Sequence, residues 1–347
     1  MSKILAIDTS CDETAAAVTE GTKILSNIIW SQASLHAKFG GVMPSLAQRQ
    51  HEEHIGFVVD KAIRAAKIKF QNLDAIAVTI GPGLSIALGV GINKAKELAK
   101  KYNLATRGRK KIIAVNHLEG HLLSSFANNE HLVSDIKYPC LGLVVSGGNT
   151  QLIFIEKIGK YKILAETQDD ALGEALDKSA RMLGLGYPGG AILEKMARSG
   201  NLKKYMLPMP IVGHEDRKIF TYSGLKTAMN RLIGSEKPLT KEKIYDLAAC
   251  FQDVAFTHLL RVVSFIIHNS PFKIHDLLVG GGVSANVELR KRLRQMGKKY
   301  GIAVHFPYSK KLYGDNAAMI GVAAYFKAQR EEFIEIDKID RNPRAKL

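Results

Sequence analysis

Cysteine is scarce in this chain. Its 347 residues include three cysteines, Cys11, Cys140 and Cys250, which lie far apart in the sequence. Because no CxxC pair occurs, the sequence predicts neither a zinc ribbon nor a disulfide framework. The odd number and the wide spacing fit a reducing compartment, so we expect a cytoplasmic protein.

Long hydrophobic runs are missing as well. The first residues reach Asp8 without an apolar run of the length that a signal peptide needs. The most apolar long stretch, Val254 to Ile267, is interrupted by His258 and Arg261. We therefore expect neither a secretion signal nor a membrane-spanning segment, and no membrane partner.

Acidic residues are outnumbered by basic ones. The chain has 49 Lys and Arg against 33 Asp and Glu, which gives a net charge of +16. An excess of this size favours polyanionic partners such as nucleic acid, although a charge that only aids solubility is the alternative. The basic loop TRGRKK, residues 106–111, is either a solvated turn or a phosphate contact, and its candidate contact residues are Arg107, Arg109 and Lys110.

The rest of the composition is that of a globular protein. Hydrophobic residues make up 46% of the chain, which excludes a disordered polypeptide. At about 150 residues per domain, the length predicts roughly two domains.

Strands and helices alternate along both halves of the chain. In each half, a meander of strands precedes apolar strands that lead directly into helices. The first half has the strand Ala75–Ile80 before the helix Leu84–Lys101, and the second has Ile274–Val279 before Ser284–Tyr300. This order predicts an α/β fold with largely parallel sheets, and its repetition predicts a duplicated fold of two lobes with a cleft between them.

Two histidines four residues apart form the sharpest local motif. In His117-Leu118-Glu119-Gly120-His121, a helix would place both imidazoles on one face, where they could share a divalent metal. Two hydrogen-bonded histidines at a strand–helix junction are the alternative. A zincin needs glutamate directly after the first histidine, and Leu118 stands there instead. No third metal ligand is adjacent in the sequence.

Glycine-rich turns follow strands in the second half. The turn Gly280–Asn286 (GGGVSAN) opens a helix, and bare glycines there allow close approach of an anionic ligand. The turn Val145–Asn149 (VSGGN) separates two strands. A tight structural turn is the alternative interpretation for each. In the first half, the loop after Asp8 carries the further acids Asp12 and Glu13, which could hold a metal, orient water or contact a basic partner.

Taken together, the strand-end loops resemble those of the actin, Hsp70 and sugar-kinase (ASKHA) superfamily. The full set resembles one family within it, the TsaD family, formerly Gcp, of tRNA N6-adenosine threonylcarbamoyltransferases. The matching segments run in order over nearly the whole chain: IDTSCDET (7–14), FGGVMPSLAQRQH (39–51), GPGLSIALGVG (81–91), NHLEGH (116–121), VSGGNTQL (145–152), DDALGEALDK (169–178), LGLGYPGG (183–190), FTYSGLKT (220–227), GGGVSAN (280–286) and YGDNAAMIG (313–321).

The resemblance implies a domain plan and a metal site. It implies an N-terminal actin-like lobe, residues 1–125, a C-terminal actin-like lobe, residues 126–330, and a loose polar tail, residues 331–347. In the family, His117 and His121 of the HxEGH motif bind iron or zinc. The third ligand is Asp315 of the GDNxAM segment, which we expect from the opposite lobe.

The resemblance also implies which residues bind the nucleotide or the activated substrate. They belong to the two glycine turns, to the LDK and YPGG segments and to the acid four residues after YPGG: Val145, Ser146, Gly147, Gly148, Asn149, Asp177, Gly190, Glu194, Gly281, Gly282 and Asn286. One position departs from the bacterial pattern, because Asn149 stands where bacterial members usually have His. An asparagine can still donate and accept hydrogen bonds, so we expect binding to be retained.

The implied reaction transfers a threonylcarbamoyl group from threonylcarbamoyl-AMP to N6 of adenosine 37. The acceptor lies in tRNAs that read codons beginning with A, and AMP is released. Asp12 and Glu13 are candidates for the proton acceptor. The implied partners are the tRNA anticodon stem-loop, TsaB-like and TsaE-like proteins, and a TsaC/Sua5-like synthase that supplies the donor.

Three other classes of protein are the alternatives. Leu118 argues against a metalloprotease. The histidine pair argues against a small-molecule kinase or ATPase of the same superfamily, since those proteins lack it. It also argues against a non-catalytic assembly partner resembling the family's smaller paralogue, which lacks the metal histidines.

Overall fold

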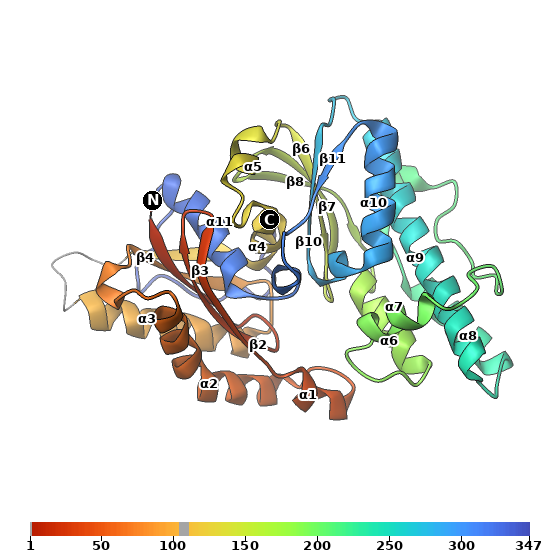
Figure 1. Ribbon diagram of the computed structural model, residues 1–347, viewed down its shortest axis with the longest axis horizontal. Coiled ribbons are helices and arrows are strands. Elements are labelled where there is room, and N and C mark those ends of the chain that lie inside the picture. The colour runs from red at the N-terminus through yellow and green to blue at the C-terminus, as the bar shows by residue number, and fades with distance from the viewer. Residues whose placement is uncertain (1, 104–110) are drawn as a thin grey trace. The chain divides into compact units, whose positions relative to one another are not determined.

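The structure is a computed structural model that describes residues 2–103 and 111–347. The chain forms two compact units, drawn in Figure 1. The first unit contains Met1–Ile136, Ile158–Lys160 and Phe306–Leu347, and the second contains Lys137–Lys157 and Tyr161–His305.

These units differ from the predicted lobes, 1–125 and 126–330. The segment from Phe306 onward returns to the first unit, because its helix α11 (Ala317–Gln329) packs on strands β1 (Lys3–Asp8) and β2 (Glu13–Glu20). Asp315 therefore belongs to the same unit as the histidine motif, and the expectation that it comes from the opposite lobe is wrong.

The first unit is built on a five-stranded sheet. Its strand order is β3-β2-β1-β4-β5, where β3 is Lys23–Ser31, β4 is Ala75–Gly81 and β5 is Lys111–Asn116. Strand β1 pairs antiparallel with β2 and parallel with β4. The first three strands therefore form the predicted meander, but the sheet is mixed rather than largely parallel.

Helices cover both faces of this sheet. Leu5 and Ile7 of β1 pack into one core with α2 and α3, and the alternate residues Ile4 and Ala6 are equally buried on the other face. Helix α11 covers that other face, where it contacts β1 and β2. The helices of this unit are α1 (Ala33–His36), α2 (Pro44–Ala65), α3 (Ser85–Asn103), α4 (His117–Leu123), α5 (Glu130–Asp135) and α11.

The second unit repeats the plan of the first. Its sheet has the order β11-β10-β6-β7-β8-β9, with β6 antiparallel to β7 and parallel to β10. The strands are β6 (Cys140–Val145), β7 (Thr150–Lys157), β8 (Lys160–Thr167), β9 (Ile219–Phe220), β10 (Asp276–Gly280) and β11 (Ala303–His305). The helices are α6 (Leu172–Met182), α7 (Gly190–Ala197), α8 (Ser223–Ser235), α9 (Lys241–His268) and α10 (Val287–Tyr300). The predicted duplication is thus present in the order of connections.

By length and composition, helix α9 could cross a membrane, although the sequence predicts no membrane-spanning segment. Of its most apolar 18-residue window, 56% is buried inside the structure. Core helices of soluble proteins pass the same test, so the finding is weak evidence for a membrane span.

The last residues are not the loose tail that the sequence predicts. The main chain of Ile334 donates to Ile112 of β5 at 2.9 Å, and that of Asn342 donates to Ile80 of β4 at 2.7 Å. Gly81 accommodates this approach, because a Cβ atom there would lie 1.8 Å from the carbonyl oxygen of Asn342. We call residues 331–347 the C-terminal strap.

Candidate metal centre and glycine-lined pocket

Helix α4 begins directly where strand β5 ends. The side chain of Asn116 caps the helix by accepting a hydrogen bond from the amide of Leu118 at 2.8 Å. His117 and His121 follow one helical turn apart, and both are buried. Asp315 comes from the segment just before α11, and α11 packs against α4.

These three side chains meet at one point in the first unit. Nε2 of His121 lies 3.1 Å from Oδ1 of Asp315, and Nε2 of His117 lies 3.4 Å from the same oxygen. One ligand atom from each residue lies within 4.8 Å of the other two. The structure thus brings together the three predicted metal ligands.

Asp8, at the end of β1, supports His117 from the other side. Its Oδ2 lies 3.4 Å from Nδ1 of His117. Burial alone would lower the pKa of His117, but the carboxylates of Asp315 and Asp8 raise it well above its usual value. Burial and the neighbouring His117 lower the pKa of His121.

The donor set fits a divalent transition metal. Two imidazoles and one carboxylate are ligands that zinc and non-haem iron both accept. Nδ1 of His121, Nδ1 of His117 and Oδ2 of Asp8 are buried without a hydrogen-bond partner. With its Nε2 toward Asp315 and its Nδ1 toward Asp8, His117 has the orientation of a metal-binding histidine backed by a carboxylate.

The acid-bearing loop after β1 lies close to this cluster. Burial and the neighbouring carboxylates of Asp12 and Asp315 raise the pKa of Glu13 well above its usual value. The hydroxyl of Ser31 donates to Glu13 at 3.0 Å. Behind the loop, buried His51 lies 3.0 Å from the carbonyl oxygen of Cys11. The sequence marked Asp8 only as one of three acids, without linking it to His117.

The C-terminal strap reaches the cap of α4. The side-chain amide of Asn116 donates to the main-chain carbonyl of Lys346 at 3.0 Å, while its oxygen caps the helix. The strap therefore fixes the orientation of the residue that caps the helix carrying His117 and His121. Sequence reasoning missed this contact because it depends on a backbone group.

Deleting residues 346–347 is expected to weaken metal binding. The deletion removes the acceptor of the Asn116 amide, which should cost about 1 kcal/mol and raise the Kd of the metal a few-fold. Lys346→Ala is the matched control, because it keeps the main-chain carbonyl. Titration of the metal into both apo variants measures the difference. Equal Kd values for the two would contradict the role of the strap.

The second unit contains a pocket of ≈ 280 Å³ lined by its glycine turns. The walls come from the starts of α6, α7 and α10. Six of the residues predicted to bind substrate line it together: Gly147, Asp177, Gly190, Glu194, Gly282 and Asn286. Val145, Ser146, Gly148, Asn149 and Gly281 are not among its lining residues.

Polar side chains organise the pocket rather than point freely into it. Oδ1 of Asp177 accepts hydrogen bonds from the amides of Gly189 and Gly190 at 2.9 and 2.6 Å. Oε1 of Glu194 accepts from the amide of Val287 at 3.0 Å. These carboxylates occupy the first amides of α7 and α10, so they shape the wall of the pocket.

Asn286 is a helix cap. Its oxygen accepts from the amides of Glu288 and Leu289 at 3.0 and 3.1 Å, and its amide donates to Gln252 at 2.9 Å. The family resemblance predicts a ligand contact for Asn286, whereas its side-chain contacts in the structure are those of a helix cap.

Asn286→Ala is therefore expected to destabilise the apo protein by about 1–2 kcal/mol. It should leave the affinity for adenine nucleotides nearly unchanged once the protein is folded. Thermal unfolding and calorimetric titration of ATP measure the two effects. Full stability combined with a large loss of ATP affinity would show instead that Asn286 contacts the ligand.

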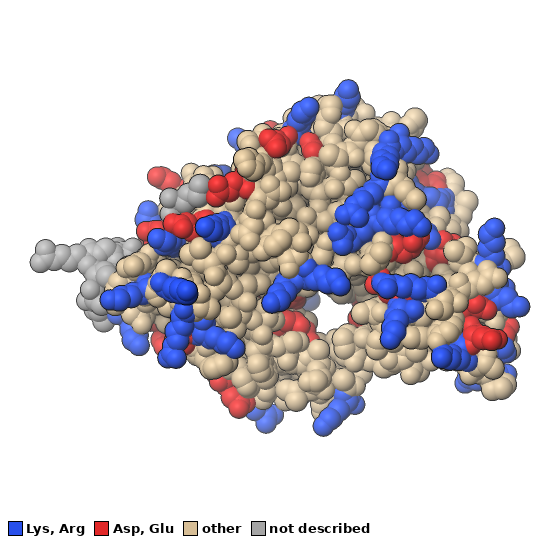
Figure 2. Space-filling model, in the orientation of Figure 1, with Lys and Arg blue, Asp and Glu red and all other residues tan. Residues whose placement is uncertain are grey.

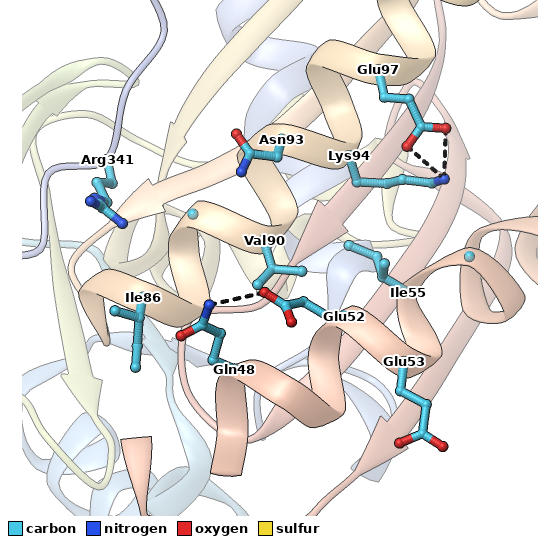
Figure 3. Close-up of a pocket in the computed structure, with 12 residues that line it drawn as sticks. Gln48, Glu52, Glu53, Ile55, Ile86, Val90, Asn93, Lys94, Glu97 and Arg341 are labelled. Carbon is cyan, nitrogen blue, oxygen red and sulfur yellow. Dashed lines mark hydrogen bonds and ion pairs between the residues drawn. The ribbon is translucent and has the colours of Figure 1, made fainter. Parts of the chain in front are cut away.

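A further cavity, of ≈ 440 Å³, lies in the first unit (Figure 3). Its lining includes the acids Glu52, Glu53 and Glu97 and the cations Lys94 and Arg341, and Lys94 pairs with Glu97 at 3.0 Å. None of the residues predicted to bind substrate lines this cavity. Arg107, Arg109 and Lys110 lie outside the described residues.

Comparison with solved structures identifies the fold. The structure resembles the solved T. kodakarensis HypF, with a TM-score of 0.61, 12% sequence identity, and coverage of 95% of this chain and 48% of that one. It also resembles component A of (R)-2-hydroxyglutaryl-CoA dehydratase from Acidaminococcus fermentans, with a TM-score of 0.53, 13% identity, and coverage of 95% and 100%. Two units that are each built on a mixed sheet with the same order of connections form the ASKHA fold.

The family follows from sequence comparison. The model of the TsaD family, tRNA N6-adenosine threonylcarbamoyltransferase, matches residues 23–322. The enzyme of this description from Clostridium kluyveri is 44% identical over 337 residues, covering 94% of this chain and 93% of the relative. That from Endomicrobium trichonymphae is 43% identical over 351 residues, covering 99% and 97%. The chain belongs to the TsaD family, and its activity is the formation of t6A in tRNA.

Proposed function

We propose that this transferase uses threonylcarbamoyl-AMP as donor and N6 of adenosine 37 as acceptor. The observation that carries the proposal is the convergence of His117, His121 and Asp315 in a member of this family. The N6 nitrogen attacks the carbamoyl carbon and forms a C–N bond. The C–O bond to the phosphate breaks, its electron pair leaves with AMP, and the N6 nitrogen gives up a proton.

We propose iron or zinc as the metal, held by the two Nε2 atoms and by Oδ1 of Asp315. When bound, such an ion stabilises negative charge that develops on oxygen atoms of the donor. Asp8, whose Oδ2 lies 3.4 Å from Nδ1 of His117, is the carboxylate that would orient this ring when the metal is bound. Asp12 and Glu13 are the candidate proton acceptors, and burial beside Asp12 and Asp315 raises the pKa of Glu13, which makes its carboxylate a stronger base.

The glycine-lined pocket is the proposed site of the adenylate part of the donor. Glycine at residues 147, 190 and 282 lets the main chain approach a ligand closely. Asn149 would hydrogen-bond the substrate in place of the histidine that bacterial members usually have. The proposed further partners are TsaB-like and TsaE-like proteins and a TsaC/Sua5-like synthase. The proposed compartment is the cytoplasm, and Arg107, Arg109 and Lys110 are proposed to contact tRNA phosphates.

Reconstitution tests the proposal. The protein is mixed with threonylcarbamoyl-AMP and unmodified tRNA that reads an A-initial codon, with and without the partner proteins. Nucleosides are then analysed by mass spectrometry. Appearance of t6A with release of AMP supports the donor and the acceptor. Its absence under all conditions, with metal bound, would exclude threonylcarbamoyl-AMP as the donor.

A further inference from the structure

Helix α10 concentrates positive charge. Its sequence, VELRKRLRQMGKKY, has six Lys and Arg residues and a single Glu. Figure 2 shows Lys and Arg side chains gathered over this helix, which Figure 1 draws in blue. A helix with this charge attracts polyanions strongly.

The charge lies on the solvent side of the helix. Leu289, Leu293, Met296 and Gly297 are buried and fix the inner face. Lys291, Arg294 and Lys298 are exposed and spaced three and four residues apart, so they form one stripe along the outer face.

Arg292, by contrast, links α10 to α9 within the second unit. Its Nε lies 2.7 Å from Glu288, and its Nη2 lies 2.7 Å from Asp253 on α9. Glu288 also lies 3.9 Å from the exposed Lys291, a longer contact than its 2.7 Å pair with Arg292. The stripe of Lys291, Arg294 and Lys298 presents about one cation per helical turn to solvent.

The C-terminal end of α10 borders a cavity of ≈ 500 Å³. Two aromatic residues, Phe265 of α9 and Tyr300 of α10, line this cavity. Its polar lining includes His268, Asn269, Lys299 and the ion pair of Arg261 with Glu215. Aromatic rings beside polar groups and a basic track are the features that hold an unpaired base next to its backbone.

We infer that the outer face of α10 binds the phosphate backbone of tRNA and that the α9–α10 cavity receives an unpaired base of the same strand. The inference deepens the proposed function, on which it rests for the identity of the RNA. Charge of one sign along the stripe favours a phosphate backbone over a protein surface of mixed charge.

Charge reversal tests the stripe. The triple variant Lys291→Glu, Arg294→Glu, Lys298→Glu should bind unmodified tRNA at least tenfold more weakly at low salt. Its slope of log K against log salt should be shallower by roughly 2 to 3, because up to three phosphate contacts are lost. The matched control carries the same charge change at three exposed cations of the first unit, Lys61→Glu, Arg64→Glu and Lys67→Glu.

A base-stacking variant tests the cavity. Tyr300→Ala should weaken tRNA binding roughly tenfold without changing the salt slope, since no charge is removed. Tyr308→Ala, which removes an exposed tyrosine of the first unit, is its control. Thermal unfolding of each variant confirms that it is folded at the assay temperature.

The outcomes separate this inference from the proposed function. A selective loss in the α10 triple variant, with normal turnover at saturating tRNA, supports the inference. Equal losses in both triple variants would assign the effect to net charge and overturn it. If the α10 triple variant bound tRNA normally but no longer bound anionic lipid vesicles, this result would also overturn the inference. Binding is measured without the donor, so failure of the wild-type protein to make t6A affects only the proposed function.

Discussion

Replacing both His117 and His121 with alanine is expected to abolish metal binding and transfer. The double variant leaves Asp315 as the only one of the three ligands, and one carboxylate holds a transition metal weakly. We expect the bound metal to fall below a tenth of the wild-type content and t6A formation to fall at least about 100-fold. Elemental analysis of the purified protein measures the first effect, and nucleoside mass spectrometry measures the second.

His131→Ala is the matched control for the metal prediction. His131 is an exposed histidine of α5 in the same unit. Its removal changes the histidine count without touching the cluster, so metal content and transfer should stay at wild-type values. Full metal occupancy in the His117→Ala, His121→Ala variant would show that the metal is bound elsewhere.

Gly281→Ala is expected to be strongly destabilising. Gly281 has a φ angle of +92°, and a Cβ atom there would lie 2.3 Å from the carbonyl oxygen of Val145 in β6. Backbone strain and overpacking together should cost about 3 kcal/mol. For a unit of this size, that corresponds to a fall in Tm of roughly 6–12 °C. The turn that follows lines the glycine pocket, so ATP affinity should fall as well.

Gly234→Ala provides the comparison for Gly281. Gly234 lies in α8, and no atom lies within 4 Å of the position that a Cβ atom would take, so alanine should be neutral or mildly stabilising there. Differential scanning fluorimetry, with and without ATP, follows both variants. A wild-type Tm for Gly281→Ala would refute the close approach of this turn to β6.

Local patterns predicted that His117 and His121 would lie on one face of a helix, as they do in the structure. The spacing of His117 and His121 needs only one helical turn, and the strand before them ends where the apolar run ends. Asp315 is 194 residues away from His121, so no spacing rule links them. The prediction that Asp315 is the third ligand rested on the family resemblance alone. Its assignment to the opposite lobe was wrong because the order of residues along the chain does not show where the chain returns.

Backbone contacts explain most of what the sequence could not predict. The strap looked loose because its side chains are polar and have no periodicity. Its main-chain amides nevertheless bond to β4 and β5, and these contacts leave almost no pattern in the sequence. The sheets were expected to be largely parallel, yet the antiparallel pairs β1–β2 and β6–β7 make both of them mixed.

The division of the first unit has a consequence for how the protein is made. Residues 161–305 belong to the second unit and leave the ribosome before residues 306–347, which complete the first. His117 and His121 are therefore synthesised before the second unit, and Asp315 is synthesised after it. The second unit can thus be complete in the nascent chain before the third side chain of the His117, His121 and Asp315 cluster has been synthesised.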